Sequence, residues 1–183
     1  MFSAEVFRNA FDHLILVEGG YVDNPYDSGG KTMYGITESV ARENGFSGDM
    51  RDLNLDFART VYKRKYWDVN NLDNIGAFDP KIAKEMFESG VNAGPNRVAK
   101  WLQKTLNLLN RRATLYKNLI VDGDIGSKTL NALAVLYDKD DLHSVEVLLN
   151  GYQMKHYIDI SEKNEELETF IRGWIKRVHI DGI

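Results

Sequence analysis

The chain has 183 residues, of which 43% are hydrophobic and 27% are charged. This balance is typical of a folded globular protein and excludes a disordered or fibrous chain. The formal net charge of −4 gives no overall basic field that would attract nucleic acid or an anionic membrane. Cysteine is absent, so disulfides, thiol nucleophiles and thiolate metal sites are excluded as well.

The sequence also bears on where the protein acts. No stretch approaches the roughly 18 consecutive apolar residues of a membrane span. The N-terminus lacks the basic start and the apolar run of a signal peptide. We therefore expect no membrane insertion, and an export route other than a signal peptide.

The first expected helix runs from Ser3 to Glu18, with apolar residues at helical spacing, Ser3 as its N-cap and Gly19-Gly20 as its stop. Residues 21–34 follow with a high density of turn signals, among them Asn24-Pro25 and Gly29-Gly30. This stretch predicts an irregular loop or a short hairpin. Catalytic residues often lie on such loops.

The rest of the chain favours helices, so the predicted fold class is mainly α. Asp79-Pro80 predicts a helix start, Gly94 its end, and Pro95 the start of the next helix. A polar loop is expected after Trp67, and a short strand and turn at 120–123. The other expected helices lie at 37–44, at 55–66, after Ser127 as an N-cap, at 141–160 and at 165–179. A boundary near Gly94-Pro95 would divide a region of residues 1–94 from one of residues 95–183.

Glu18 is the residue that first indicates chemistry. It lies four residues after Leu14 and seven after Phe11, so it continues the apolar face of the first helix. A carboxyl held against apolar side chains is costly to ionise, which raises its pKa and suits it to act as a general acid. Glycosidic bond cleavage needs such an acid to protonate the leaving oxygen. The alternative is that Glu18, next to two glycines, turns outward into water.

A distinctive motif begins at Glu18. It consists of Glu18-Gly19-Gly20-Tyr21, then Asn24-Pro25 and Asp27-Ser28-Gly29-Gly30-Lys31-Thr32-Met33-Tyr34-Gly35-Ile36-Thr37. This motif resembles the signature of the glycoside hydrolase 108 family of bacteriophage and bacterial N-acetylmuramidases. The resemblance places the catalytic glutamate at Glu18. It also implies a lysozyme-like helical fold for residues 1–94.

Later motifs extend the resemblance over almost the whole chain. The segment 86–95, with Val91-Asn92-Ala93-Gly94-Pro95, is similar to a helix end of the family, with Gly90 in place of an alanine. Three further segments look like the peptidoglycan-binding region often fused behind this catalytic unit: Trp101-Leu102-Gln103, 121–126 with Thr129, and Phe170-Ile171-Arg172-Gly173-Trp174.

The spacing of Glu18, Asp27 and Thr32 also resembles the catalytic arrangement of phage-type lysozymes. In that interpretation Asp27 stabilises positive charge on the sugar ring or orients a water, which Thr32 helps to hold. Two structural alternatives are open: Asp27 forms an Asx-turn, and Thr32 satisfies loop backbone groups.

Four further residues are candidates for substrate binding, each with a structural alternative. Tyr21 and Tyr34 either stack on sugar faces or fill core. Thr37 competes with Thr32 for the catalytic role or caps the next helix. Asn92 bonds either an acetamido group or the backbone at a helix end.

Other motifs are too incomplete to indicate a site. Gly29-Gly30-Lys31-Thr32 lacks the first glycine of a phosphate loop, since Pro25 stands there. Asp122-Gly123-Asp124 lacks the remaining ligands of a calcium loop. The four histidines are scattered without metal-ligand spacing. The three tryptophans are expected in the core, with a glycan platform open for Trp67.

The expected function is a peptidoglycan hydrolase that cleaves the β-1,4 bond between N-acetylmuramic acid and N-acetylglucosamine. A lytic transglycosylase and a non-catalytic peptidoglycan-binding or secretion-assisting protein are the alternatives. We expect no cofactor, no metal, no nucleic-acid partner and a monomer that binds glycan strands. The family implies a phage endolysin or prophage copy, made in the bacterial cytoplasm and released to the wall by a membrane-permeabilising partner.

Overall fold

The computed structural model describes residues 2–18, 20–23, 30–139 and 141–178, and in these residues the chain is mainly helical. Helix α1 (Phe2–Glu18) is followed by a two-stranded antiparallel hairpin, β1 (Thr32–Met33) and β2 (Ile36–Thr37). The predicted fold class is thereby confirmed, including the short hairpin after the first helix.

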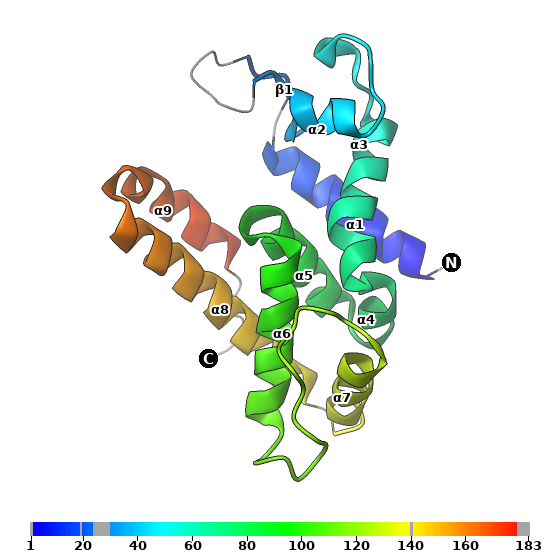
Figure 1. Ribbon diagram of the computed structural model, residues 1–183, viewed down its shortest axis with the longest axis vertical. Helices are drawn as coiled ribbons and strands as arrows, with labels where there is room; N and C mark the ends of the chain where they lie inside the picture. Colours follow the sequence, from blue (N-terminus) through cyan, green and yellow to red (C-terminus); the bar gives the residue numbers. More distant parts are fainter. Residues whose placement is uncertain (1, 19, 24–29, 140, 179–183) are drawn as a thin grey trace.

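The helices that follow the hairpin continue to Arg177 (Figure 1). In chain order they are α2 (Glu38–Glu43), η1 (Met50–Asp52), α3 (Leu55–Tyr62), the π-helical turn η2 (Lys63–Trp67), η3 (Asp68–Asn70), α4 (Leu72–Phe78), α5 (Pro80–Ala93), α6 (Pro95–Leu109), α7 (Ser127–Tyr137), α8 (Leu142–Lys163), η4 (Glu165–Leu167), α9 (Glu168–Trp174) and η5 (Ile175–Arg177).

Helix α5 lies at the centre of the molecule and packs against α1, α4, α6 and α8. Its sequence ends are those expected, because Asp79 accepts a hydrogen bond from the Lys81 N–H and Gly94 ends the helix at a φ of 91°. Large side chains around α5 are fully buried in one cluster that includes Phe11, Trp67, Phe87, Leu102 and Leu133. The core therefore continues across the Gly94-Pro95 connection, and the division into residues 1–94 and 95–183 stays a prediction.

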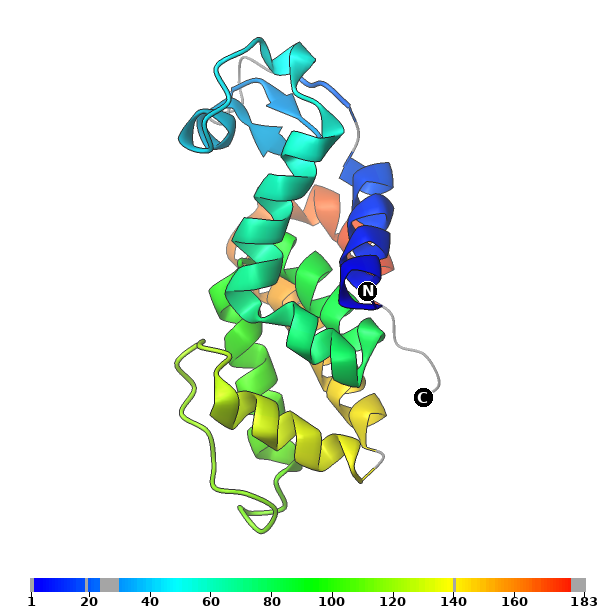
Figure 2. The ribbon, with the colours of Figure 1, turned by 90° about the vertical axis from the view of Figure 1, so that its right-hand side faces the viewer.

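The long axis separates two ends of the molecule. The hairpin, α2 and η1 lie at one end, whereas α7 and the connection from α6 to α7 lie at the other (Figures 1 and 2). Helix α1 points its C-terminal end, and hence Glu18, toward the hairpin end.

Several local expectations were wrong. Helix α1 begins at Phe2, so Ser3 is inside the helix. No strand forms at 120–121, and Ser127 follows the cap residue Gly126. The expected helix 165–179 is divided into η4, α9 and η5. The expected polar loop after Trp67 is helical as η3 and α4.

Trp67 and Trp101 are buried, and the indole N–H of Trp67 donates to Asp73 at 2.7 Å. The glycan-platform interpretation of Trp67 is therefore wrong. In the described parts of the chain, no helix has the length and apolar character needed to cross a membrane.

Candidate active site

Glu18 is the last residue of α1, and the apolar face that leads to it is buried. Phe11 is completely buried and Leu14 nearly so, and α1 packs against α4 and α5. The last turn of α1 holds no basic residue that would offset the negative end of the helix dipole. The backbone of residue 18 therefore lies at the edge of the core, at the end of α1 that precedes the hairpin.

A β-bridge closes the segment that carries Asp27. Val22 and Thr32 exchange two backbone hydrogen bonds, N–H to O=C, of 2.9 and 2.8 Å. This bridge joins the two ends of the stretch 23–31, so that the connection leaves and returns at one place beside the end of α1. Asp27 itself, with residues 24–29, lies outside the described residues.

Thr32 and Thr37 are cross-strand partners in the hairpin. Paired residues of an antiparallel ladder present their side chains on the same face. The Thr32 hydroxyl is 3.4 Å from the Gly30 carbonyl oxygen, to which it donates, and Thr37 Oγ1 accepts from the Val40 N–H at 3.4 Å. Thr37 thus caps α2, as its structural alternative predicted, and Thr32 keeps acceptor capacity on its hydroxyl.

The hairpin turn places Tyr34. Tyr34 and Gly35 both have positive φ, 53° and 73°, which suits the tight turn between two antiparallel strands. The buried Tyr62 of α3 donates its hydroxyl to the Tyr34 carbonyl oxygen at 3.1 Å. The Tyr34 ring is half-buried and packs against the core. Tyr34, which is not a glycine, is therefore held in the unfavourable left-handed backbone conformation at the tip of the hairpin.

Tyr21 lies beside the hairpin and contacts both Arg51 and Asp23. The Arg51 guanidinium carbon is 5.0 Å from the centre of its ring, and the Tyr21 hydroxyl donates to Asp23 at 3.1 Å. Partial burial and the bond to Asp23 raise the Tyr21 pKa, so the hydroxyl stays protonated at neutral pH. The ring is half-buried, and both alternatives for Tyr21 stay open.

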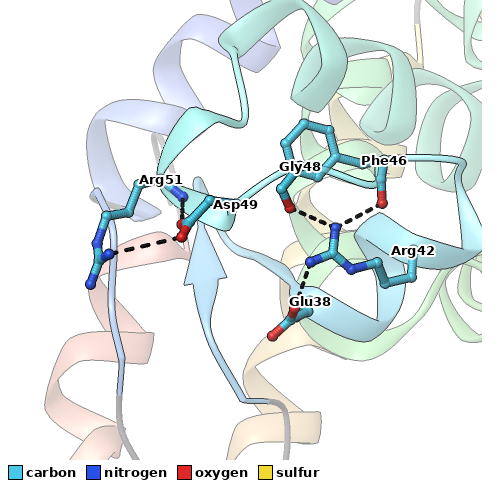
Figure 3. A network of polar contacts seen from close by, with 6 residues as sticks. All are labelled: Glu38, Arg42, Phe46, Gly48, Asp49 and Arg51. Carbon is cyan, nitrogen blue, oxygen red and sulfur yellow. Dashed lines mark hydrogen bonds and ion pairs between the residues drawn. The ribbon is translucent and has the colours of Figure 1, made fainter.

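Arg51 is itself positioned by Asp49, at the start of η1 (Figure 3). Asp49 accepts from the Arg51 backbone N–H at 2.9 Å and lies 3.9 Å from its guanidinium. That backbone hydrogen bond lowers the pKa of Asp49, which keeps the carboxylate ionised. Helix η1 contacts strand β1, so this pair supports the hairpin from one side.

Arg42 of α2 holds the loop that leads to η1. Its guanidinium donates to the carbonyl oxygens of Phe46 and Gly48, at 2.9 and 2.7 Å, and to Glu38 at 2.6 Å (Figure 3). Three donors in one fork fix the path of residues 46–48 relative to α2. Arg42 and Arg51 were missed in the sequence because their roles depend on backbone oxygens and on a ring distant in the chain.

Asn92 lies in the last turn of α5 on the same side as the end of α1. His13 of α1 bonds Glu88 of α5 at 2.8 Å, and Val6 lies opposite Ala83 across Gly76, so the two helices run in the same direction. The Asn92 amide donates to the Glu88 carbonyl oxygen at 2.9 Å. Its oxygen accepts from Arg177 at 2.5 Å. The bond to Glu88 agrees with the alternative in which Asn92 bonds the backbone at a helix end. A role of Asn92 in substrate binding stays a prediction.

Two C-terminal motifs meet around Gln103. The buried Gln103 amide donates to Asp122 Oδ1 at 2.7 Å and to the Asp124 carbonyl oxygen at 3.0 Å, and its oxygen accepts from the Gly123 N–H at 2.8 Å. Gly123 has a φ of 87°, and a Cβ there would lie 2.4 Å from the Asn96 amide. The segment 121–126 is thus a tight turn fixed on α6.

Two known protein families match the two parts of the chain. Residues 11–94 match the family described as Glycosyl hydrolase 108, from the middle of α1 to the glycine that ends α5. The N-terminal region is therefore similar to the glycosyl hydrolase 108 family. Residues 97–179 match the family described as Predicted Peptidoglycan domain. A glycosyl hydrolase 108 region followed by a peptidoglycan domain supports a peptidoglycan hydrolase, with peptidoglycan as its ligand.

A solved structure has a similar architecture. The chain is similar to SagA from Brucella abortus, with a TM-score of 0.69 and 27% sequence identity. The similarity covers 96% of this chain and 90% of SagA, so it includes both regions. No curated protein sequence matches the chain.

Proposed function

We propose that the protein hydrolyses the β-1,4 bond between N-acetylmuramic acid and N-acetylglucosamine, with Glu18 as the general acid. The observation that carries this proposal is the glycosyl hydrolase 108 match, within which Glu18 ends a helix whose apolar face is buried. Glycoside hydrolases need a carboxylic acid that is protonated before the bond breaks. The last turn of α1 holds no basic residue that would offset the negative end of the helix dipole.

In the proposed reaction the Glu18 carboxyl donates its proton to the glycosidic oxygen as the bond to the muramic C1 breaks. The sugar ring then carries positive charge, and a water molecule adds to C1 and loses a proton to a base. Asp27 is the proposed carboxylate that stabilises this charge or orients the water, and Thr32 the proposed partner of that water. The Val22–Thr32 bridge supports this pairing, because it anchors both ends of the segment that carries Asp27 next to Thr32.

The proposed glycan-binding surface consists of Tyr21 and Tyr34 with the hairpin between them. Aromatic rings stack on the apolar faces of sugars, and both rings are half-buried with one part accessible. Arg51 over the Tyr21 ring, and Tyr62 below the turn, support these two positions. Thr37 and Asn92 are further proposed substrate-binding residues, and each also bonds a backbone group, Thr37 at the start of α2 and Asn92 within α5.

Digestion of purified peptidoglycan, followed by mass spectrometry of the fragments, tests the reaction. Hydrolysis by the proposed route leaves reducing muramic acid ends. Fragments with 1,6-anhydro-muramic ends would instead show a lytic transglycosylase, in which the muramic hydroxyl attacks and no water is consumed. If no glycan fragment forms, the protein is a binding protein and the proposal is wrong.

The proposed substrate lies outside the cytoplasmic membrane, so we propose that the protein acts on the bacterial wall. Synthesis in the cytoplasm and release by a membrane-permeabilising partner, as in a phage endolysin, are part of this proposal. Fractionation of a producing culture before and after membrane permeabilisation tests it, because wall cleavage is expected only after permeabilisation.

A further inference from the structure

A groove in the peptidoglycan domain lies apart from the hairpin. It runs between α6 and α8 and has a volume of about 390 Å³, within the range of small-molecule sites. Its walls are formed by Arg97, Trp101 and Lys104 from α6, and by Tyr152, Lys155, His156, Asp159, Ile160 and Lys163 from α8. A second hollow, at the turn from α5 to α6, adjoins it through Arg97 and includes Lys100.

The groove is basic although the chain as a whole is acidic. On α6, Arg97, Lys100 and Lys104 are three and four residues apart, which places them on one helix face. On α8, Lys155 and Lys163 flank Asp159 at intervals of four residues. The Lys155 ammonium bonds both oxygens of Asp159, at 2.7 and 2.8 Å, so the acidic residue of the lining is already neutralised. The remaining cations are available to an anion from outside.

One wall of the groove is aromatic. The rings of Trp101 and Tyr152 are nearly parallel, with centres 6.2 Å apart, and the His156 ring lies 5.8 Å from Trp101. Burial and the nearby Arg97 lower the His156 pKa, so its ring is neutral at pH 7. Arg97 lies 3.2 Å from His156 Nε2, which orients the guanidinium along this wall. The groove thus combines an apolar surface with a row of cations.

We propose that this groove binds the carboxylates of the peptide stems of peptidoglycan, while its aromatic wall contacts the apolar part of the same ligand. The inference rests on the proposed function, which makes peptidoglycan the substrate. The glycan strand itself is neutral where each lactyl group carries a peptide. The anionic groups that complement Arg97, Lys100, Lys104 and Lys163 are therefore those of the stems. The groove then anchors the polymer on the domain that follows the catalytic region.

Sedimentation with purified sacculi tests the anchor. The assay uses full-length protein carrying Glu18→Gln, so that binding is measured without digestion. Adding Lys104→Glu and Lys163→Glu, both at exposed positions of the groove, should weaken binding about tenfold, because exposed charge pairs contribute modestly and reversal adds repulsion. Lys117→Glu with Lys128→Glu, exposed and outside the groove lining, is the control of equal charge and should bind like the parent. Thermal unfolding verifies that all proteins fold equally.

A second comparison identifies the ligand chemistry. Soluble stem peptide with free carboxylates, added in excess as a competitor, should weaken binding of the parent to the level of the groove variant, whereas the same peptide with amidated carboxyl groups should not. Equal binding of parent and groove variant to intact sacculi would overturn the proposal. So would parent binding that an excess of the stem peptide does not weaken, or binding that disappears only when phosphate-containing wall polymers are extracted.

Failure of the groove and failure of the proposed function give different results. If the wild-type protein cleaves glycan but the groove variant sediments normally, the groove assignment is wrong and the hydrolase stands. If binding depends on the groove and on the stems but no glycan bond is cleaved, the groove stands and the hydrolase is wrong.

Discussion

The backbone and the side chain of Thr32 have separate roles: the backbone pairs within the hairpin, and the hydroxyl is a candidate for catalysis. Its backbone is bonded to Val22 on one side and it pairs with Thr37 on the other, so its position is fixed without help from its side chain. The hydroxyl makes one long contact of 3.4 Å with Gly30. The backbone fixes the position of this hydroxyl, and the fold makes little use of it. The hydroxyl can therefore bond a water or a substrate.

Replacing Thr32 by valine removes the hydroxyl and retains the β-branched shape that suits a strand. We expect turnover of peptidoglycan to fall by about 10- to 100-fold, as when a group that orients a reactant is lost, with little change in thermal stability. The measurement is the initial rate of release of reducing ends. Thr32→Ser, which keeps the hydroxyl, should retain most activity. If the valine variant is as active as the wild type, Thr32 serves only the hairpin.

The sequence led to Thr37 and Tyr34 as candidates but left their roles open, and local geometry explains why. A threonine before a helix can cap it, and here Thr37 does so. Tyr34 looked like a ring that stacks or fills core, but its positive φ depends on the hairpin turn and on the Tyr62 hydroxyl from α3. A contact between residues 28 positions apart leaves no local signal in the sequence.

Among the elements, the best predicted are those with strong local signals. Asp79-Pro80 and Gly94-Pro95 marked the limits of α5 and the start of α6, because caps, proline and glycine act on their own turn. Helix α4 was missed. It begins directly after its cap residue Asn71, which is in the left-handed region, and its Gly76 lies against Val6 and Ala83. That packing, which joins α1, α4 and α5, stabilises a short helix with weak propensity.

The hairpin is the element on which the candidate site depends most. Gly35 has a φ of 73°, which alanine adopts at a cost of about 1 kcal/mol. Gly35→Ala should therefore lower the free energy of unfolding by about that amount and reduce turnover, because the turn beside Thr32 and Tyr34 is disturbed. Urea unfolding and initial rates measure the two effects.

Gly151→Ala is the matched control for the same chemical change. Gly151 lies inside α8, and a Cβ there meets nothing within 4 Å. Alanine should stabilise this helix by about 0.5 to 1 kcal/mol and leave turnover unchanged. A Gly35→Ala protein with wild-type stability would contradict the strained turn.

At the scale of the whole molecule, α5 and α8 join the two family regions through a buried interface. Glu85 of α5 is 6% exposed there and accepts from the Ser89 hydroxyl at 2.6 Å. Burial raises the Glu85 pKa to about 7, with Glu88 and Glu146 adding to the increase and Ser89 and Lys84 opposing it. Tyr157 of α8 is a further titratable group near Glu85. The interface therefore favours the protonated form of a carboxyl.

This arrangement makes stability depend on pH. The folded pKa of Glu85 lies above its usual value of 4.5, so its contribution is fully present below pH 4.5 and is lost as pH rises through about 7. The loss is on the order of 3 kcal/mol. Glu85→Gln keeps an acceptor for Ser89 and cannot ionise, so it should be more stable than the wild type at pH 8 and similar at pH 5.

Chemical unfolding at the two pH values measures this difference. Glu162→Gln, at an exposed position of α8, is the control and should follow the wild type at both. Identical pH profiles for the wild type and Glu85→Gln would show that Glu85 is not the titrating group.

Digestion of purified peptidoglycan by the Glu18→Gln protein tests most directly whether Glu18 is the acid of a glycosidase. Glutamine has nearly the same shape but carries no acidic proton, so we expect a folded protein with the thermal stability of the wild type. We also expect the release of reducing muramic ends to fall by at least about 100-fold, as when a general acid is removed. Release of those ends by Glu18→Gln at a rate near that of the wild type would contradict the role of Glu18.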